Sequence, residues 1–182
     1  MAITAAQVKE LRERTGLGMM DCKKALVEVD GDMEKAVDLL RKKGLKTAEK
    51  RAGRATNQGW IGVAFSEDGR TAALVDLACE TDFVAKSDDF QNVLAGMAKH
   101  ALAQGFAGGK SVAEELQDAV GRIGEKIELR NVAHQSADGN GAVVSYIHHN
   151  GRVGVLVKGS VDGGPKNADA LADLLDKVAK HT

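Results

Sequence analysis

Few residues in this chain stand at spacings that could support catalysis. The segment GFAGGKS, Gly105 to Ser111, comes near the phosphate loop G-x-x-x-x-G-K-[ST], whose backbone amides cradle phosphate groups. Its first glycine is one residue too close, a predicted helix precedes it where a strand is needed, and Ser111 is expected to cap the next helix. We therefore interpret the segment as a connection between two helices.

The histidines and cysteines show no metal-ligand spacing. His148 and His149 are adjacent, and neighbouring side chains on a strand point to opposite faces, so we do not expect them to share a metal. Cys22 and Cys79 lie far apart, which disfavours both a disulfide framework and a zinc site. The remaining histidines are isolated: His100, His134 and His181. We predict no catalytic residue, no metal site and no cofactor, and therefore no enzyme.

Two apolar features are better candidates for binding. In CETDFVAK, Cys79 to Lys86, Phe83 stands beside Asp82 at the junction of two apolar runs. If a helix begins near Thr81, Phe83 lines up with the inward-facing Phe90, whereas a helix capped by Ser87 leaves Phe83 on a loop, where contact residues are common. Spacing leaves both interpretations open.

Met19 and Met20 form the second feature. They follow a glycine turn, and both can hardly be buried in so small a helical module. Exposed methionine is an adaptable contact residue at binding surfaces. Taken from spacing alone, a core role and an interface role stay equally open.

Length and composition bound the function. A chain of 182 residues suits two small domains. Its net charge of −1 gives no general attraction to nucleic acid or to an anionic membrane. No segment approaches the roughly 20 apolar residues that span a bilayer, and the polar start of the chain does not read as a signal peptide. We expect a cytoplasmic protein.

The elements that must position these residues begin with three short helices. Thr4 and Gln7 form a capping box, Gly16 follows the first helix, and Asp32 caps a third helix that we expect to end at Gly44. Residues 1–44 thus predict a three-helix domain. The basic stretch Arg41 to Arg54 lacks interleaved aromatic residues, so we interpret 45–58 as a solvated, partly helical linker with no direct contact to nucleic acid.

The pattern changes to strands after Gly59. GWIGVAF and TAALVDLAC are joined at Asp68-Gly69, a strong hairpin signal, and two amphipathic helices and the strand KIELRNVA follow. The sequence then repeats itself: Asn150-Gly151 falls on Asp68-Gly69, 82 residues further along. We predict an α+β fold with a duplicated β-β-α-α-β core, residues 59–139 and 140–182, whose second copy is incomplete.

Four segments, in order, resemble the elongation factor Ts family, the exchange factors for guanine nucleotide on elongation factor Tu in bacterial translation. They are VKELRERTGLGMMDCKKAL, CETDFVAK, IGEKIELR and YIHHNGRVGVLV. The family fold implied is a ubiquitin-associated-like three-helix domain, a linker and a core of two related subdomains. Longer members of the family extend beyond the second subdomain, and the unfinished sheet predicted here exposes an edge that could pair with a second copy.

The resemblance also implies a site. Its partner is elongation factor Tu, GDP-bound or nucleotide-free. The resemblance implies that Phe83 enters the nucleotide domain near Mg²⁺ with Asp82 beside it, that the helical module docks on the same domain, and that His148 reaches another domain. The implied contact residues are Thr81, Asp82, Phe83, Val84, Lys86, Leu11, Arg12, Met19, Met20 and His148. An alternative is an adaptor whose helical module binds RNA or another protein.

Overall fold

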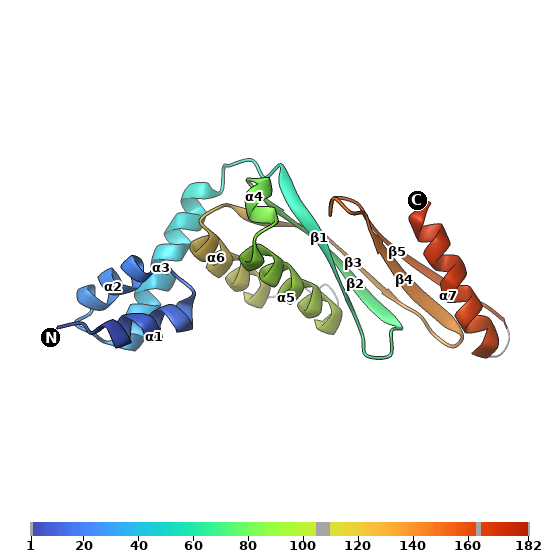
Figure 1. Ribbon diagram of the computed structural model, residues 1–182, viewed down its shortest axis with the longest axis horizontal. Helices are drawn as coiled ribbons and strands as arrows, with labels where there is room; N and C mark the ends of the chain where they lie inside the picture. The colour runs from blue at the N-terminus through green and yellow to red at the C-terminus, as the bar shows by residue number, and fades with distance from the viewer. Residues whose placement is uncertain (1, 105–109, 163–164, 182) are drawn as a thin grey trace. The chain divides into compact units, whose positions relative to one another are not determined.

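The computed structural model describes residues 2–104, 110–162 and 165–181, which form helices and antiparallel strands (Figure 1). The α+β class predicted from the sequence is confirmed. The chain groups into two compact units, one of Ala113–Lys126 with the residues up to Ala55, and one of Thr56–Val112 with the residues from Ile127 onward. The elements are α1 Ala5–Thr15, α2 Met19–Glu28, α3 Met33–Arg51, β1 Gln58–Phe65, β2 Thr71–Cys79, α4 Asp82–Ala85, α5 Asp88–Gln104, α6 Lys110–Ile123, β3 Ile127–Ser136, β4 Gly141–Ile147, β5 Gly154–Ser160 and α7 Pro165–Lys180.

The first unit contains the three predicted N-terminal helices. The Thr4 hydroxyl accepts the Gln7 amide at 3.3 Å while the Gln7 side chain accepts the Thr4 amide at 2.9 Å, so the capping box is confirmed. Gly16 ends α1 in the left-handed conformation, which glycine adopts without a steric cost. One apolar core joins the helices: Val8, Leu11, Cys22, Ala25, Leu26, Ala36 and Leu40.

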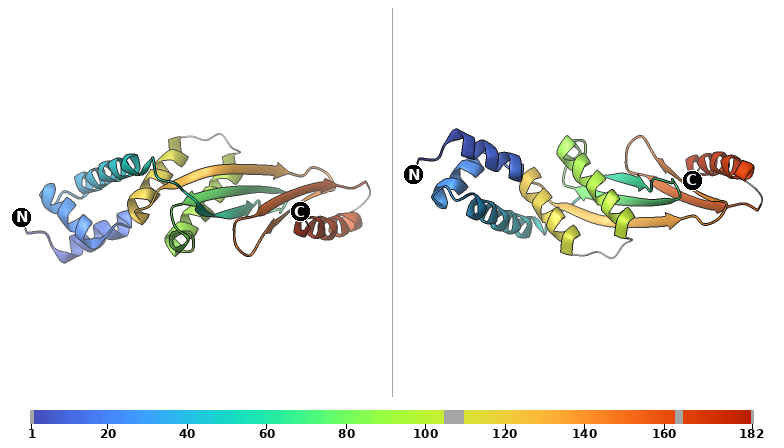
Figure 2. Two further views of the ribbon diagram at one scale, coloured as in Figure 1. Left: turned by 90° about the horizontal axis from the view of Figure 1, so that it is seen from above. Right: turned by 90° about the horizontal axis from the view of Figure 1, so that it is seen from below.

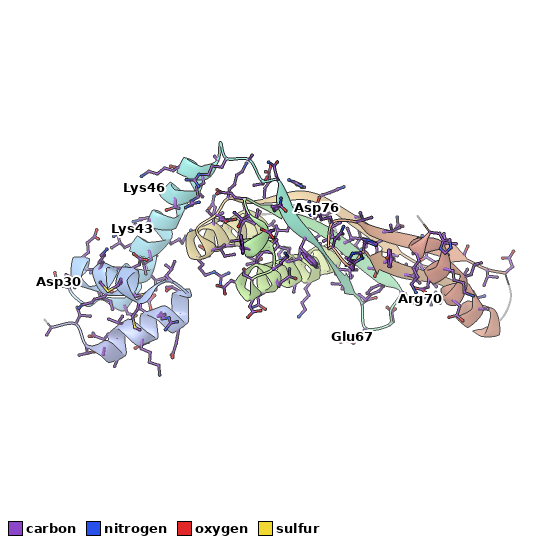
Figure 3. The ribbon with its side chains drawn as sticks, turned by 45° about the horizontal axis from the view of Figure 1, so that its top comes forward. Asp30, Lys43, Lys46, Glu67, Arg70 and Asp76 are labelled. Carbon is purple, nitrogen blue, oxygen red and sulfur yellow. The ribbon has the colours of Figure 1, made fainter. Side chains whose placement is uncertain are left out.

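Helix α3 does not end at Gly44, which corrects the sequence prediction. It continues to Arg51 and carries Lys43 and Lys46, which project from it in Figure 3. A helical glycine costs about 1 kcal/mol relative to alanine. Here the missing side chain lets α6 approach, since a Cβ on Gly121 would lie 3.3 Å from the Gly44 Cα. The division into segments 1–44, 45–58, 59–139 and 140–182 stays a prediction.

The second unit opens with the predicted hairpin. Strands β1 and β2 pair antiparallel, and β3 joins the other side of β2. In the turn, the Asp68 carboxylate accepts the Arg70 amide at 3.0 Å, and Gly69 has a positive φ of 68°. Figure 3 labels Glu67 and Arg70 at this end of the hairpin. Helix α5 packs on β1 and β2 through the predicted face: Phe90, Val93, Leu94, Met97 and Ala101 are all buried.

A second hairpin has the same turn chemistry. Strands β4 and β5 pair antiparallel, the Asn150 side chain accepts the Arg152 amide at 3.0 Å, and Gly151 has a φ of 69°. Both views in Figure 2 show α7 lying along this hairpin. A small core of Ala72, Ala137 and Val143, with Val63 and Leu156 packed against it, joins the second hairpin to the first sheet.

Candidate functional site

The segment from Thr81 to Ser87 contains two helix starts. Thr81 caps α4, a single turn, by accepting the Val84 amide on its hydroxyl at 3.3 Å. Ser87 then opens α5, because its hydroxyl accepts the Phe90 amide at 3.3 Å. The two interpretations that the spacing left open are therefore each partly right. The backbone breaks between the helices, so Phe83 and Phe90 do not share one helical face.

Phe83 points outward. Its side chain is 83% exposed, whereas Phe90 is fully buried. Ala85, on the opposite side of the same turn, is buried and holds α4 against the sheet. An exposed ring forgoes about 1.5–3 kcal/mol of favourable burial. The outward direction predicted for Phe83 is confirmed, and its contact with a partner stays a prediction.

An ion pair borders this ring. The ammonium of Lys86, the residue that follows α4, lies 3.0 Å from the carboxylate of Asp82, the first residue of that helix. Its hydrogen bond lowers the pKa of Asp82 below the ordinary value of 3.8. Both side chains are substantially exposed, so the pair adds little stability. It instead places a carboxylate and an ammonium group next to the exposed Phe83 ring.

We expect Lys86→Met to return the Asp82 pKa toward 3.8, since that substitution removes the hydrogen bond that lowers it most. Because folding lowers this pKa, the contribution of the pair to stability is present above the ordinary pKa and is lost as pH falls through the lowered one. NMR titration of the Asp82 side-chain carboxyl carbon measures the pKa in the wild type and in the variant. An Asp82 midpoint that is the same in the variant and the wild type would contradict the assignment.

Cys79 stabilises the start of this segment, a role that the sequence analysis did not predict. It ends β2, is fully buried, and its thiol donates to the Thr81 carbonyl over 3.1 Å. That bond lies within the turn that leads the chain from β2 into α4. The sequence signal was present, since a cysteine that closes an apolar run is typical of a buried position.

The N-terminal candidates divide into exposed and buried residues. Met19 and Met20 are 53% and 62% exposed, and Arg12 is also exposed. Val27, seven residues after Met20 on α2, adds an exposed apolar side chain that sequence reasoning missed. Leu11 is a correction: it is fully buried in the three-helix core and cannot touch a partner directly.

His148 lies past the end of its strand, which corrects a second expectation. Strand β4 ends at Ile147, so the alternation of faces no longer applies, and the His148 and His149 ring centroids are 4.1 Å apart. His148 is half-buried, and its Nδ1 lies 2.9 Å from the Tyr146 hydroxyl. The Tyr146 hydroxyl, from a residue near the end of β4, thus holds this imidazole in place.

The turn after His148 is fixed to the first sheet. The Ile61 amide donates to the Gly151 carbonyl at 2.8 Å, and the Arg152 guanidinium donates to the Gln58 side chain. Gly151 is buried against Trp60, whose indole leaves no space for a Cβ. These contacts tie His148 to strand β1, against which α4 also packs.

The residues that the structure describes contain no group of three or more His, Cys, Asp or Glu side chains arranged to hold a metal ion. Cys22 and Cys79 are both buried and are not joined in a disulfide. The segment GFAGGKS lies outside the described residues except at its end. In the parts of the chain that the structure describes, no helix is both long and apolar enough to span a bilayer.

The basic stretch of α3 is partly neutralised within its own unit. Lys43 pairs with Glu28 at 2.6 Å, and Arg41 lies 3.8 Å from Glu114 of α6. Lys126 donates to the Arg54 carbonyl at 3.2 Å. These pairs are exposed and individually weak, yet they give several basic side chains acidic or carbonyl partners within the chain.

Known proteins are similar in sequence to this chain over most of its length. A family model described as Elongation factor TS matches residues 80–182. Proteins named Elongation factor Ts are similar to it: that of Trichlorobacter lovleyi is 50% identical, covering 100% of this chain and 63% of its own, and that of Desulfovibrio desulfuricans is 51% identical, covering 86% and 56%. The protein of Prosthecochloris aestuarii is 40% identical, covering 97% and 66%.

The chain therefore spans less than two thirds of the length of these relatives. The family match includes the segment with α4, the strand β3 and the second hairpin with its His148 turn. Since the model matches more than half of its residues, the chain belongs to the elongation factor Ts family.

Proposed function

We propose that this chain is a guanine-nucleotide exchange factor in translation elongation, which binds elongation factor Tu loaded with GDP and promotes GDP release in the cytoplasm. The observation that carries the proposal is the 83% exposed Phe83, presented on a capped helical turn inside the segment matched by the family. Its place in the family-matched segment supports a contact role, since a few well-buried side chains supply most of the binding energy at protein interfaces.

The physical mechanism needs no covalent chemistry. Phe83 inserts beside the Mg²⁺ that anchors GDP on the partner, with Asp82 next to it. Mg²⁺ demands near-ideal octahedral geometry, so a small displacement of its surroundings weakens the nucleotide. Burial of the ring supplies about 1.5–3 kcal/mol, and about 1.4 kcal/mol changes an affinity tenfold. By linkage, a factor that weakens GDP binding is itself bound more weakly by the GDP-loaded partner.

Two further contacts complete the proposal. Arg12, Met19 and Met20 dock on the nucleotide domain of the partner, where flexible methionine side chains adapt to an apolar surface. His148 reaches another domain of the partner. Thr81 and Val84 act mainly by shaping α4, because their hydrogen bond closes its only turn.

The finer architecture is also a proposal. We propose a ubiquitin-associated-like domain in α1–α3 and a duplicated core whose second copy includes β4, β5 and α7. The matching turns at Asp68-Gly69 and Asn150-Gly151, each followed by an arginine and a second strand, support the duplication. Among the described residues β4 and β5 pair with each other alone, so an outer edge could pair with a second copy.

The experiment that tests the function is release of fluorescent GDP from purified elongation factor Tu, with and without this chain. We expect faster release with catalytic amounts of the chain, at a rate that rises with its concentration. Release at the spontaneous rate, with the chain shown to be folded, would contradict the proposal. Sedimentation of the chain alone tests the homodimer: a single monomer species across concentrations would remove it.

For the helical module, we expect the double variant Met19→Ala, Met20→Ala to bind elongation factor Tu at least about tenfold more weakly, because two exposed side chains lose their burial in the complex. Leu174→Ala is the matched control, since Leu174 is 57% exposed on α7, outside the proposed contacts. Calorimetric titration measures the affinities. Equal affinities for the double variant and the control would contradict docking through α2.

An adaptor that binds RNA is the weaker alternative. Lys43 and Arg41 of the basic stretch are paired with acidic residues, and the net charge of the chain is −1. Salt-sensitive binding of RNA by this chain would favour the adaptor, because neutralisation of phosphates releases counterions.

A further inference from the structure

The pair Tyr146 and His148 has a geometry that specifies a hydrogen-bond role. Tyr146 lies on β4, and His148 follows two residues later, just past the end of the strand. The Tyr146 hydroxyl lies 2.9 Å from His148 Nδ1, and the rings meet edge to face with centroids 6.0 Å apart. The contact is therefore a directed hydrogen bond to one particular nitrogen of the imidazole.

The direction of that bond determines whether Nε2, the other ring nitrogen of His148, is a hydrogen-bond donor or an acceptor. A neutral imidazole has one donor nitrogen and one acceptor nitrogen, and the bond made by one nitrogen sets the other. A phenol donates better than it accepts, because its oxygen lone pair is partly delocalised into the ring. With Tyr146 as donor, Nδ1 is the acceptor, and the proton sits on Nε2.

The turn that carries His148 is held in place, because the His148 amide donates to the Val153 carbonyl at 2.8 Å and Gly151 is packed on Trp60.

We propose that Tyr146 is a positioning residue: it holds His148 as the neutral Nε2–H tautomer, so that the imidazole offers a hydrogen-bond donor to an oxygen acceptor on the partner. This inference rests on the proposed function for its partner, elongation factor Tu, while the tautomer belongs to this chain alone. A carbonyl and a carboxylate oxygen share the required chemistry. Binding measured from low to high salt separates them, because a charge-assisted contact is screened.

The first test is ¹⁵N NMR of the imidazole side chains in the full chain. We expect His148 to carry its proton on Nε2 in the wild type and to lose this preference in Tyr146→Phe, which keeps the ring and removes the hydroxyl. His134, an exposed residue of β3, serves as the internal control, with a tautomer balance that the substitution leaves unchanged. A proton on Nδ1 in the wild type, or an unaltered tautomer in Tyr146→Phe, would overturn the inference.

The second test is affinity for nucleotide-free elongation factor Tu in a double-mutant cycle. We expect Tyr146→Phe to weaken binding about two- to tenfold, the range for one neutral hydrogen bond. His148→Gln, whose amide N–H₂ replaces the Nε2–H donor, should bind better than His148→Ala, and Tyr146→Phe should have no effect in the His148→Gln background. Additive losses would overturn the positioning role. A wild-type chain that fails to bind the partner at all would instead refute the proposed function. The NMR experiment needs no partner, so it tests the positioning role of Tyr146 separately.

Discussion

Phe83→Ala is expected to slow GDP release from elongation factor Tu by about ten- to a hundredfold relative to the wild-type chain. The variant removes a ring whose burial at the partner supplies about 1.5–3 kcal/mol, and each 1.36 kcal/mol corresponds to about tenfold in rate. Stopped-flow release of fluorescent GDP measures the rate. The effect should fall on the rate at saturating chain as well as on affinity, because the ring acts where the nucleotide is held.

Phe65→Ala is the matched control for this variant. Phe65 is a phenylalanine at the end of β1 that is 40% exposed, and it lies outside the proposed contacts. We expect its variant to release GDP within about twofold of the wild type, a difference of less than about 0.5 kcal/mol. Because Phe83 is almost fully in solvent, its variant should also unfold at the wild-type temperature. Equal rates for Phe83→Ala, Phe65→Ala and the wild type would refute the role of the exposed ring.

Gly151→Ala is expected to destabilise the chain clearly more than Gly69→Ala does. Both glycines sit in hairpin turns with positive φ, 69° and 68°, a conformation that costs other residues about 1–2 kcal/mol. They differ in the space around them: apart from its chain neighbours, no described residue has an atom within 4 Å of a Cβ on Gly69, whereas a Cβ on Gly151 overlaps the Trp60 indole. Overpacking adds about 1–3 kcal/mol at Gly151 alone.

Urea unfolding of the two variants measures this difference directly, since strain from φ is common to both and subtracts out. Gly151→Ala should also weaken partner binding, because the turn that carries His148 is displaced from β1. Gly69→Ala should bind as the wild type does. Equal losses of stability in the two variants would show that the packing of the turn on Trp60 contributes nothing.

The turns and helix faces of this fold could be predicted from the sequence where the turn residues and the apolar periodicity indicate the same element. Asp68-Gly69 and Asn150-Gly151 define their hairpins for two reasons. The Asp or Asn side chain accepts the backbone amide two residues later, and glycine adopts a positive φ without strain. The inward face of α5 follows from helical spacing that begins at Phe90. In each case residues close in sequence determine the result.

The errors arise where tertiary packing or a helix end decides. Gly44 was expected to stop α3, yet the helix passes through it because Gly121 of α6 packs there. Leu11 was grouped with the contact residues by resemblance, although its spacing from Val8 already suited the core. His148 and His149 were assigned opposite faces because the end of β4 at Ile147 cannot be seen in the sequence.

Phe83 shows the limit most clearly. It stands seven residues before Phe90, a spacing that one continuous helix would convert into a shared buried face. The second cap at Ser87 breaks that helix and turns Phe83 outward. The sequence does not show where one helix ends and the next begins, because Thr81 and Ser87 are both suitable N-cap residues. Spacing could therefore name the residue while leaving its direction open, and the outward direction was predicted from the family resemblance.

The most direct test asks whether this ring leaves water when the partner binds. Fluorine NMR of the chain labelled with 4-fluorophenylalanine, recorded in H₂O and in D₂O, reports the solvent contact of each ring. In the free chain the Phe83 signal should show a solvent isotope shift and that of the buried Phe90 should not. On addition of elongation factor Tu, we expect the Phe83 signal to move and lose its isotope shift. A complex in which that ring keeps its full contact with water would contradict the account.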